Sequence, residues 1–116
     1  MRTGVRFAGL PPMKKFTEAS FTDQVIKLAQ LRGWRVHHQR PARTATGWRS
    51  AIQGHPGFPD LILIRNGALI VAELKMPKGT TTPEQGEWLK TFTSISCGRV
   101  VVWRPNDWPE IERMLA

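Results

Sequence analysis

The stretch that decides the fold is residues 59–75, which read PDLILIRNGALIVAELK. Two continuous apolar runs, 61–64 and 68–72, lie on either side of Asn66-Gly67. Such runs are typical of strands buried on both faces, and Asn-Gly is the strongest short signal for a hairpin turn. We therefore expect an antiparallel hairpin with its turn at Asn66-Gly67.

The turn predicts which residues face each other. A two-residue turn pairs Arg65 with Ala68 and so places Asp60 opposite Glu73, with their Cβ atoms about 5 Å apart. A four-residue loop keeps this register, whereas a three-residue loop turns Glu73 to the other face of the sheet. Lys75 lies two residues beyond Glu73 and projects from the same face.

Two carboxylates at the end of apolar strands predict a bound cation. Like charges directly opposite each other are destabilising, and the spacing suits Mg²⁺ or Mn²⁺, with the Leu74 carbonyl as a further oxygen ligand. A lysine beside such a site fits phosphodiester hydrolysis, because it orients or helps to deprotonate the nucleophile or stabilises charge on the phosphate. The alternative is a structural ion pair of Lys75 with Asp60 or Glu73.

Further elements follow from periodicity and capping residues. We expect a helix from Thr17 to Gly33, a strand over 34–38, a helix from Thr82 to about Ser96, a strand over 99–103, and a short helix begun by Asn106 or Asp107. The order predicts an α/β fold, with an α-β-β-β-α-β core, a mixed sheet and a short C-terminal helix. His37 and His38 are neighbours on a strand, so they face opposite sides.

Length and composition indicate one domain with a polyanionic partner. In the 116 residues, 1–15 are expected to be a flexible basic tail and 16–116 a single domain. Seventeen Lys and Arg against nine Asp and Glu give a net charge of +8, which favours nucleic acid as the partner over a cationic surface kept for solubility. No apolar stretch approaches the roughly 18 residues that a membrane span needs. The single Cys97 excludes an internal disulfide and fits a reducing, cytoplasmic location.

The basic residues gather where acidic ones are missing. No Asp or Glu occurs from Gln24 to Pro59. Residues 40–57, rich in Gly, Pro, Ser and Thr, predict a long irregular loop, and such loops are usually functional or mobile. We expect this loop to bind DNA through Arg40, Arg43, Arg49 and Trp48, the alternative being a surface loop with incidental arginines. No glycine-rich phosphate loop with Lys-Ser/Thr is present, so we expect no nucleotide cofactor.

Two short motifs carry a family resemblance. Pro59-Asp60 followed by Glu73-Leu74-Lys75 resembles the Pro-Asp…(Asp/Glu)-x-Lys signature of the restriction-endonuclease-like nucleases, PD-(D/E)XK. With the helix that opens at Glu18, the basic loop and the later Thr82-Pro83-Glu84-Gln85, the arrangement resembles stand-alone members of the virus-type replication–repair nuclease (VRR-NUC) family. The resemblance covers roughly residues 16–115.

The resemblance implies a Mg²⁺- or Mn²⁺-dependent DNA endonuclease of phage or bacterial type. It implies a homodimer acting on branched DNA such as Holliday junctions, in the host cytoplasm if the protein is viral. Asp60 and Glu73 match the metal-binding acids, Lys75 the catalytic lysine, Glu18 the helical acid that completes the metal site, and Gln85 a glutamine that helps to arrange it.

Glu18 and Gln85 also have simpler, structural explanations. Glu18 is a first-turn acid that the helix dipole favours, and Gln85 fits a capping box. For the whole protein, the rivals are a catalytically silent nucleic-acid-binding module and a sequence-specific nuclease of the restriction or repair type. The chain leaves little room for a separate recognition domain, which favours recognition of DNA structure.

Overall fold

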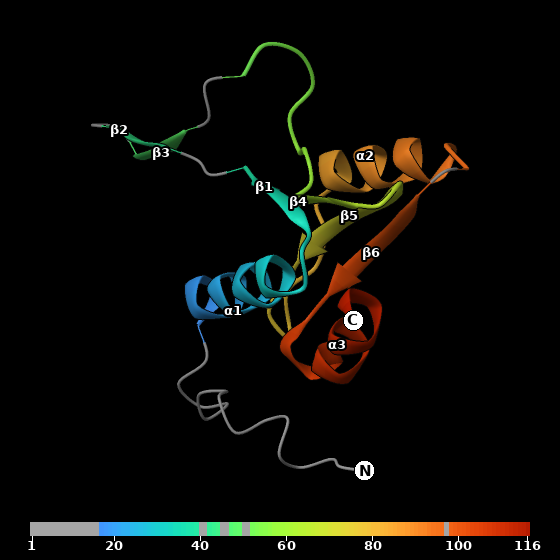
Figure 1. The fold of residues 1–116 in the computed structure, drawn as a ribbon. Helices are drawn as coiled ribbons and strands as arrows, with labels where there is room; N and C mark the ends of the chain where they lie inside the picture. The colour runs from blue at the N-terminus through green and yellow to red at the C-terminus, as the bar shows by residue number, and fades with distance from the viewer. Residues whose placement is uncertain (1–16, 40–41, 45–46, 50–51, 97) are drawn as a thin grey trace.

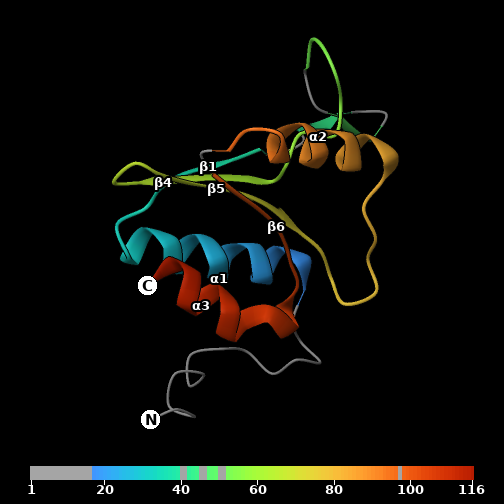
Figure 2. The same ribbon diagram turned by 90° about the vertical axis from the view of Figure 1, so that its right-hand side faces the viewer.

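A four-stranded sheet separates two layers of helices (Figures 1 and 2). The computed structural model describes residues 17–39, 42–44, 47–49, 52–96 and 98–116. The strand order in the sheet is β1 (Arg35–His38), β4 (Leu61–Arg65), β5 (Ala68–Leu74) and β6 (Arg99–Trp103). One face carries α1 (Glu18–Leu31) and α3 (Trp108–Leu115), and the other carries α2 (Pro83–Thr93). The predicted α-β-β-β-α-β core with a short C-terminal helix is confirmed.

The hairpin has the predicted register. β4 and β5 are antiparallel and pair Arg65 with Ala68 and Leu61 with Ala72. Asn66 and Gly67 have φ values of 49° and 81°, the left-handed pair that a type I′ turn requires. β1 is antiparallel to β4 and β6 is parallel to β5, so the sheet is mixed as predicted.

The main core lies between the sheet and the pair α1 and α3. Trp34 closes one end of it and donates a hydrogen bond from Nε1 to the carbonyl of Leu115 at 3.1 Å. Buried side chains recur three or four residues apart on both helices and at every second residue on the strands. They include Phe21, Val25, Ala29, Leu61, Leu63, Ile70, Ala72, Leu74, Trp108, Ile111 and Leu115.

The second face is covered less completely. All of α2 is described, and none of its residues is buried. It packs through Trp88 and Phe92, whose ring centroids lie 5.0 and 5.8 Å from that of Phe58. It covers the β6 side of the sheet, while Ile64 in β4 stays 48% exposed. The part of this face nearer to β1 is therefore open.

Capping residues set the ends of the helices. Thr17 and Thr82 begin α1 and α2 with capping boxes to Ser20 and Gln85, and Gly33 follows α1 with a φ of 86°. α2 ends at Thr93, so the predicted end at Ser96 was wrong. Ser94 is the C-cap of α2, and its hydroxyl donates to the carbonyl of Thr91 at 2.6 Å, a local bond that favours caps and turns over helix interiors.

Two further predictions need correction. Part of the stretch 40–57 is regular, because β2 (Ala42–Thr44) and β3 (Gly47–Arg49) form a two-stranded antiparallel hairpin. Its Thr and Trp residues favour extended backbone, which the composition of the loop concealed. Asp107 is the N-cap residue of α3, as predicted, but its side chain does not cap this helix, because its carboxylate accepts from the backbone N–H of Arg104. None of the described helices is long and apolar enough to cross a membrane.

Candidate metal-binding active site

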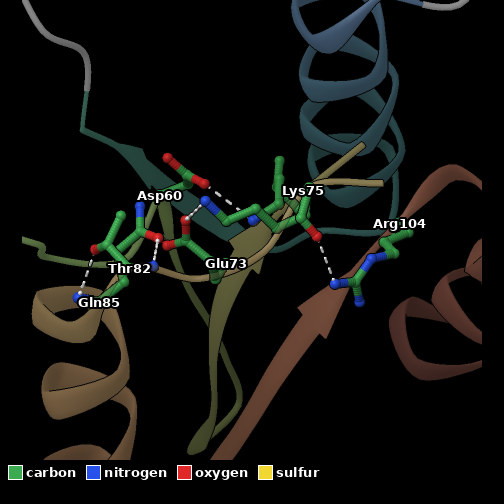
Figure 3. Close-up of polar contacts among 8 residues, drawn as sticks. Asp60, Glu73, Lys75, Thr82, Gln85 and Arg104 are labelled. Carbon is green, nitrogen blue, oxygen red and sulfur yellow. Dashed lines mark hydrogen bonds and ion pairs between the residues drawn. The ribbon is translucent and has the colours of Figure 1, made fainter. Parts of the chain in front are cut away.

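The predicted carboxylate pair lies on the α2 face of the sheet, where β4 begins and β5 ends (Figure 3). Asp60 directly precedes β4, and its Oδ2 accepts a hydrogen bond from the backbone N–H of Leu74 at 2.9 Å. Glu73 is buried in β5 at 2% exposure. Lys75 places Nζ 3.5 Å from Oε2 of Glu73. The structure thus brings together Asp60, Glu73 and Lys75, as predicted.

The surroundings of Glu73 work against its negative charge. Burial, and then the nearby charge of Asp60, raises the pKa of Glu73 from 4.5 to about 7 against the lowering effect of Lys75. One lysine therefore only partly compensates for two acids in a partly enclosed position. A divalent cation would favour the ionised form of both carboxylates.

One carboxylate oxygen at the site has no hydrogen-bond partner among the residues that the structure describes. In its ionised form, the buried Glu73 Oε1 accepts no hydrogen bond from the described residues, although buried carboxylate oxygens are normally satisfied. When Glu73 is protonated, it can share its proton with Asp60, which contributes to its raised pKa. This free oxygen and the Asp60 carboxylate are the hard donors that Mg²⁺ and Mn²⁺ prefer. The residues present therefore fit such an ion.

The described residues contain no group of three or more His, Cys, Asp or Glu side chains placed to hold a metal. Glu18, predicted as the third acid, is exposed in the first turn of α1 and is not brought to the pair. Its position suits a favourable interaction with the helix dipole. A Mg²⁺ ion usually keeps several waters and uses only one or two carboxylates, so the pair alone is a sufficient protein contribution.

Gln85 is engaged in the cap of α2. Its Oε1 accepts from the backbone N–H of Thr82 at 2.9 Å, and its own N–H donates to the Thr82 hydroxyl at 3.1 Å. The capping box accounts for a glutamine at this position. Leu74 donates its N–H to Asp60, and the metal-binding role of its carbonyl stays a prediction.

The loop that delivers Asp60 packs directly against the start of α2. Gly57 has a φ of 92°, and a Cβ at this position would lie 2.6 Å from the carbonyl carbon of Glu84 and 2.8 Å from the nitrogen of Gln85. Only glycine fits this approach. The first turn of α2 thereby holds the segment that ends in Asp60, a contact that sequence reasoning missed.

Lys75 is held by the neighbouring strand and loop. Its backbone N–H donates to the carbonyl of Trp103 at 2.9 Å, and a Cβ at Gly79 would lie 3.5 Å from Cδ of Lys75. Arg104 donates from Nη2 to the carbonyl of Gly79 at 2.9 Å. Arg104 thus ties the loop beside the lysine to the end of β6, a contact that sequence reasoning did not assign to it.

A further neighbour of the pair comes from the other side of β4. The backbone N–H of Gln39 donates to the carbonyl of Asp60 at 3.0 Å, which extends the β1–β4 ladder by one residue. Gln39 and Glu73 therefore flank Asp60 on adjacent strands. The sequence held no signal for this pairing, because a long connection joins β1 to β4.

The predicted DNA contacts are described only in part. Arg40 lies outside the described residues, as does the tail 1–15. Arg43, Trp48 and Arg49 lie on β2 and β3, where the backbone pairs Arg43 with Trp48, and their side chains lie outside the description. Their role in DNA binding stays a prediction.

No family model matches the chain, and no curated protein matches it. The resemblance to the VRR-NUC family therefore rests on the motifs alone.

Proposed function

We propose that the protein is a metal-dependent endonuclease that hydrolyses phosphodiester bonds in DNA. The observation that carries the proposal is the buried, unpartnered Oε1 of Glu73 beside Asp60, with the Lys75 ammonium 3.5 Å from the other Glu73 oxygen. Two acids and a lysine on one face are what hydrolysis of a phosphodiester needs: a place for a cation and a positive group next to it.

Each residue has a distinct task in this proposal. Bound Mg²⁺ or Mn²⁺ would supply positive charge and Lewis acidity to the attacked phosphate. Asp60 and Glu73 would hold that ion, and the Leu74 carbonyl would supply a third oxygen. Lys75 orients the attacking water or neutralises the charge that grows on the phosphate oxygens as the P–O bond breaks.

Branched DNA is the substrate we propose. The net charge of +8 and the acid-free segment from Gln24 to Pro59 support a polyanion. The choice of four-way junctions and of a homodimer follows the resemblance to the VRR-NUC family, and the cytoplasmic location follows from the single Cys97. A homodimer would place two active sites on paired strands.

The second candidate is a nucleic-acid-binding module without activity. The observation that favours it is the Glu73–Lys75 contact, which is also a structural ion pair. A binding module has no need of a buried carboxylate oxygen without a partner, however, and this oxygen supports the nuclease.

Cleavage assays with Asp60→Asn separate the two candidates. We expect a labelled four-way junction to be cut by wild type in Mg²⁺ or Mn²⁺ but not in EDTA, with linear duplex and single strand cut more slowly. Asp60→Asn should abolish cutting and leave binding unchanged. Asp23→Asn, which removes an acid exposed on α1, is the matched control and should cut like wild type. Binding without cutting in either metal would identify the silent module.

Lys75→Met tests the lysine separately. Methionine keeps most of the side-chain length without the charge, so we expect cutting to fall by about 10²–10³-fold with unchanged DNA affinity, in line with the loss of one charge-stabilising group. Single-turnover kinetics with saturating enzyme measure this directly. Cutting at the wild-type rate would remove Lys75 from the mechanism.

A further inference from the structure

The open part of the sheet beside the carboxylate pair has an ordered pattern of side chains. Val36 packs against the main core, so alternation turns Arg35 and His37 to the opposite face, where both are exposed. Gln39 continues this row and is half-buried. The three residues form the β1 strip, which runs along an edge of the sheet.

The register places the β1 strip in line with the candidate active site. Arg35 lies opposite Ile64, and His37 lies opposite Ile62. One step further along, Gln39 flanks Asp60. The strip therefore leads from the hairpin end of the sheet to the carboxylates.

The strip has free hydrogen-bonding groups. None of the side chains of Arg35, His37 and Gln39 forms a hydrogen bond or an ion pair with another residue in the described part of the chain. They present a guanidinium, an imidazole and an amide, all of which donate to phosphate oxygens. Residues two apart on a strand are separated by about 6.8 Å, which is comparable to the distance between successive phosphates along a nucleic-acid strand.

The floor beside the strip is apolar and exposed. Ile64 lies in β4, an inner strand of the sheet, yet it is 48% exposed, because α2 covers the β6 side of this face. An inner strand that exposes a large aliphatic side chain next to a guanidinium and further hydrogen-bond donors suits an amphipathic partner. A DNA strand has this character, with anionic phosphates on one side and the flat faces of sugars and bases on the other.

We propose that the β1 strip and the floor at Ile62 and Ile64 form the track for the DNA strand that is cut. Arg35 and His37 bind successive phosphates, and Gln39 binds the phosphate nearest to Asp60. The apolar floor contacts sugars or bases. This inference rests on the proposed function for the identity of the strand, but the binding surface is tested without any cutting.

Binding in EDTA measures the track alone. With a fluorescein-labelled four-way junction in 50–300 mM salt, Arg35→Ala should weaken binding by about fivefold and reduce the slope of log Kd against log salt by about one. Ile64→Asp should weaken binding by about tenfold because it places a negative charge beside the phosphates, and Ile64→Lys should strengthen it because it places a positive charge there. Gln39→Glu should also weaken it.

Arg99→Ala is the matched control. It removes the same charge from an exposed position on β6 that lies on the α1 and α3 side of the sheet, beside Trp34 and Met114. We expect the affinity of Arg99→Ala to lie within about twofold of that of wild type. Its slope of log Kd against log salt should stay close to the wild-type slope, unlike that of Arg35→Ala. Thermal unfolding of each variant checks that the fold is kept.

The outcomes distinguish the track from the proposed function. If wild type cuts in Mg²⁺ but Arg35→Ala and Ile64→Asp bind like wild type, the track is wrong and the nuclease stands. If these variants bind weakly but wild type cuts nothing, the nuclease is wrong and the track belongs to a binding module. If Ile64→Asp instead turns a dimer into a monomer and Arg35→Ala changes nothing, a second copy covers this face, and the track is overturned.

Discussion

Glu73 combines two properties that rarely occur together in a stable carboxylate. It is buried, and its nearest charged neighbours include another acid. Burial of a carboxyl destabilises its ionised form, and a second negative charge destabilises it further. The residue therefore lowers the stability of the metal-free protein at neutral pH.

Glu73→Gln should remove a pH dependence of folding. The pKa of Glu73 is raised to about 7 in the folded protein against 4.5 as its ordinary value. Below about pH 4.5 the carboxyl is protonated in both folded and unfolded chains, and between there and pH 7 only the folded chain keeps the proton. Stability should therefore fall as pH rises through this window, by up to about 1.4 kcal/mol per pH unit.

The measurement is urea unfolding of wild type and Glu73→Gln in EDTA at pH 5, 6, 7 and 8. The free energy of unfolding of Glu73→Gln, relative to that of wild type, should rise with each step to pH 7. Above pH 7 the difference between the two should stay nearly constant. Glu87→Gln, at an exposed position on α2, is the control and should follow wild type. A variant that loses stability equally at every pH would contradict the raised pKa.

At the scale of elements, the contact between residues 57–60 and the first turn of α2 fixes the position of Asp60. Gly57→Ala must move one of them, because the added Cβ meets backbone atoms at 2.6–2.8 Å. Gly67→Ala is the matched control, since Gly67 also has a positive φ of 81° but nothing within 4 Å of an added Cβ. Both changes strain the backbone by about 1–2 kcal/mol, so the excess loss in Gly57→Ala measures the contact.

We expect Gly57→Ala to lose more stability than Gly67→Ala and to lose DNA cutting as well, because Asp60 moves with its segment. Thermal unfolding and junction cleavage on the two variants together check this. Equal losses of stability, with cutting kept in both, would show that the 57–60 segment shifts without consequence for Asp60.

Gln85→Glu separates capping from catalysis. Glu also completes a capping box, so this variant should keep the stability of wild type, while Gln85→Ala should lose about 1 kcal/mol. We expect Gln85→Glu to keep cutting within a few-fold, since the structure engages this side chain in the cap. A large loss of cutting at unchanged stability would restore the catalytic role that the resemblance implies.

Predictability from sequence followed the range of the interactions. The turn at Asn66-Gly67 and the capping boxes at Thr17 and Thr82 are local, so the hairpin register, and with it the Asp60–Glu73 pair, could be predicted. The close approach of Gly57 to α2 and the pairing of Gln39 with Asp60 join segments that no short motif connects, so neither could be seen. Glu18 was placed by resemblance, and no local rule positioned it beside the pair.

At the scale of the whole molecule, the uneven cover of the sheet was also hidden from the sequence. The apolar runs of β4 and β5 predict burial on both faces, yet α2 leaves Ile64 exposed. The DNA track proposed for this face would be occupied in the assembly with a four-way junction.

Sedimentation with a four-way junction tests that assembly. A homodimer that binds both arms should give two protein chains per junction at micromolar concentration, and the complex should dissociate steeply with salt because the chain carries a charge of +8. One chain per junction under these conditions would contradict the homodimer. Paired cuts on opposite strands would support it independently.

The hairpin that carries the acids also bears on the order in which the chain folds. Asp60 and Glu73 approach across a single tight turn, so their meeting requires the closure of only a short loop. The hydrogen bond from Lys75 to Trp103 requires β6, which joins the sheet only after α2 has crossed over it. Local contacts generally form before distant ones. We therefore expect the two acids to meet early, so that the proposed divalent ion would meet both of its carboxylates on a nascent hairpin before the rest of the domain has closed around them.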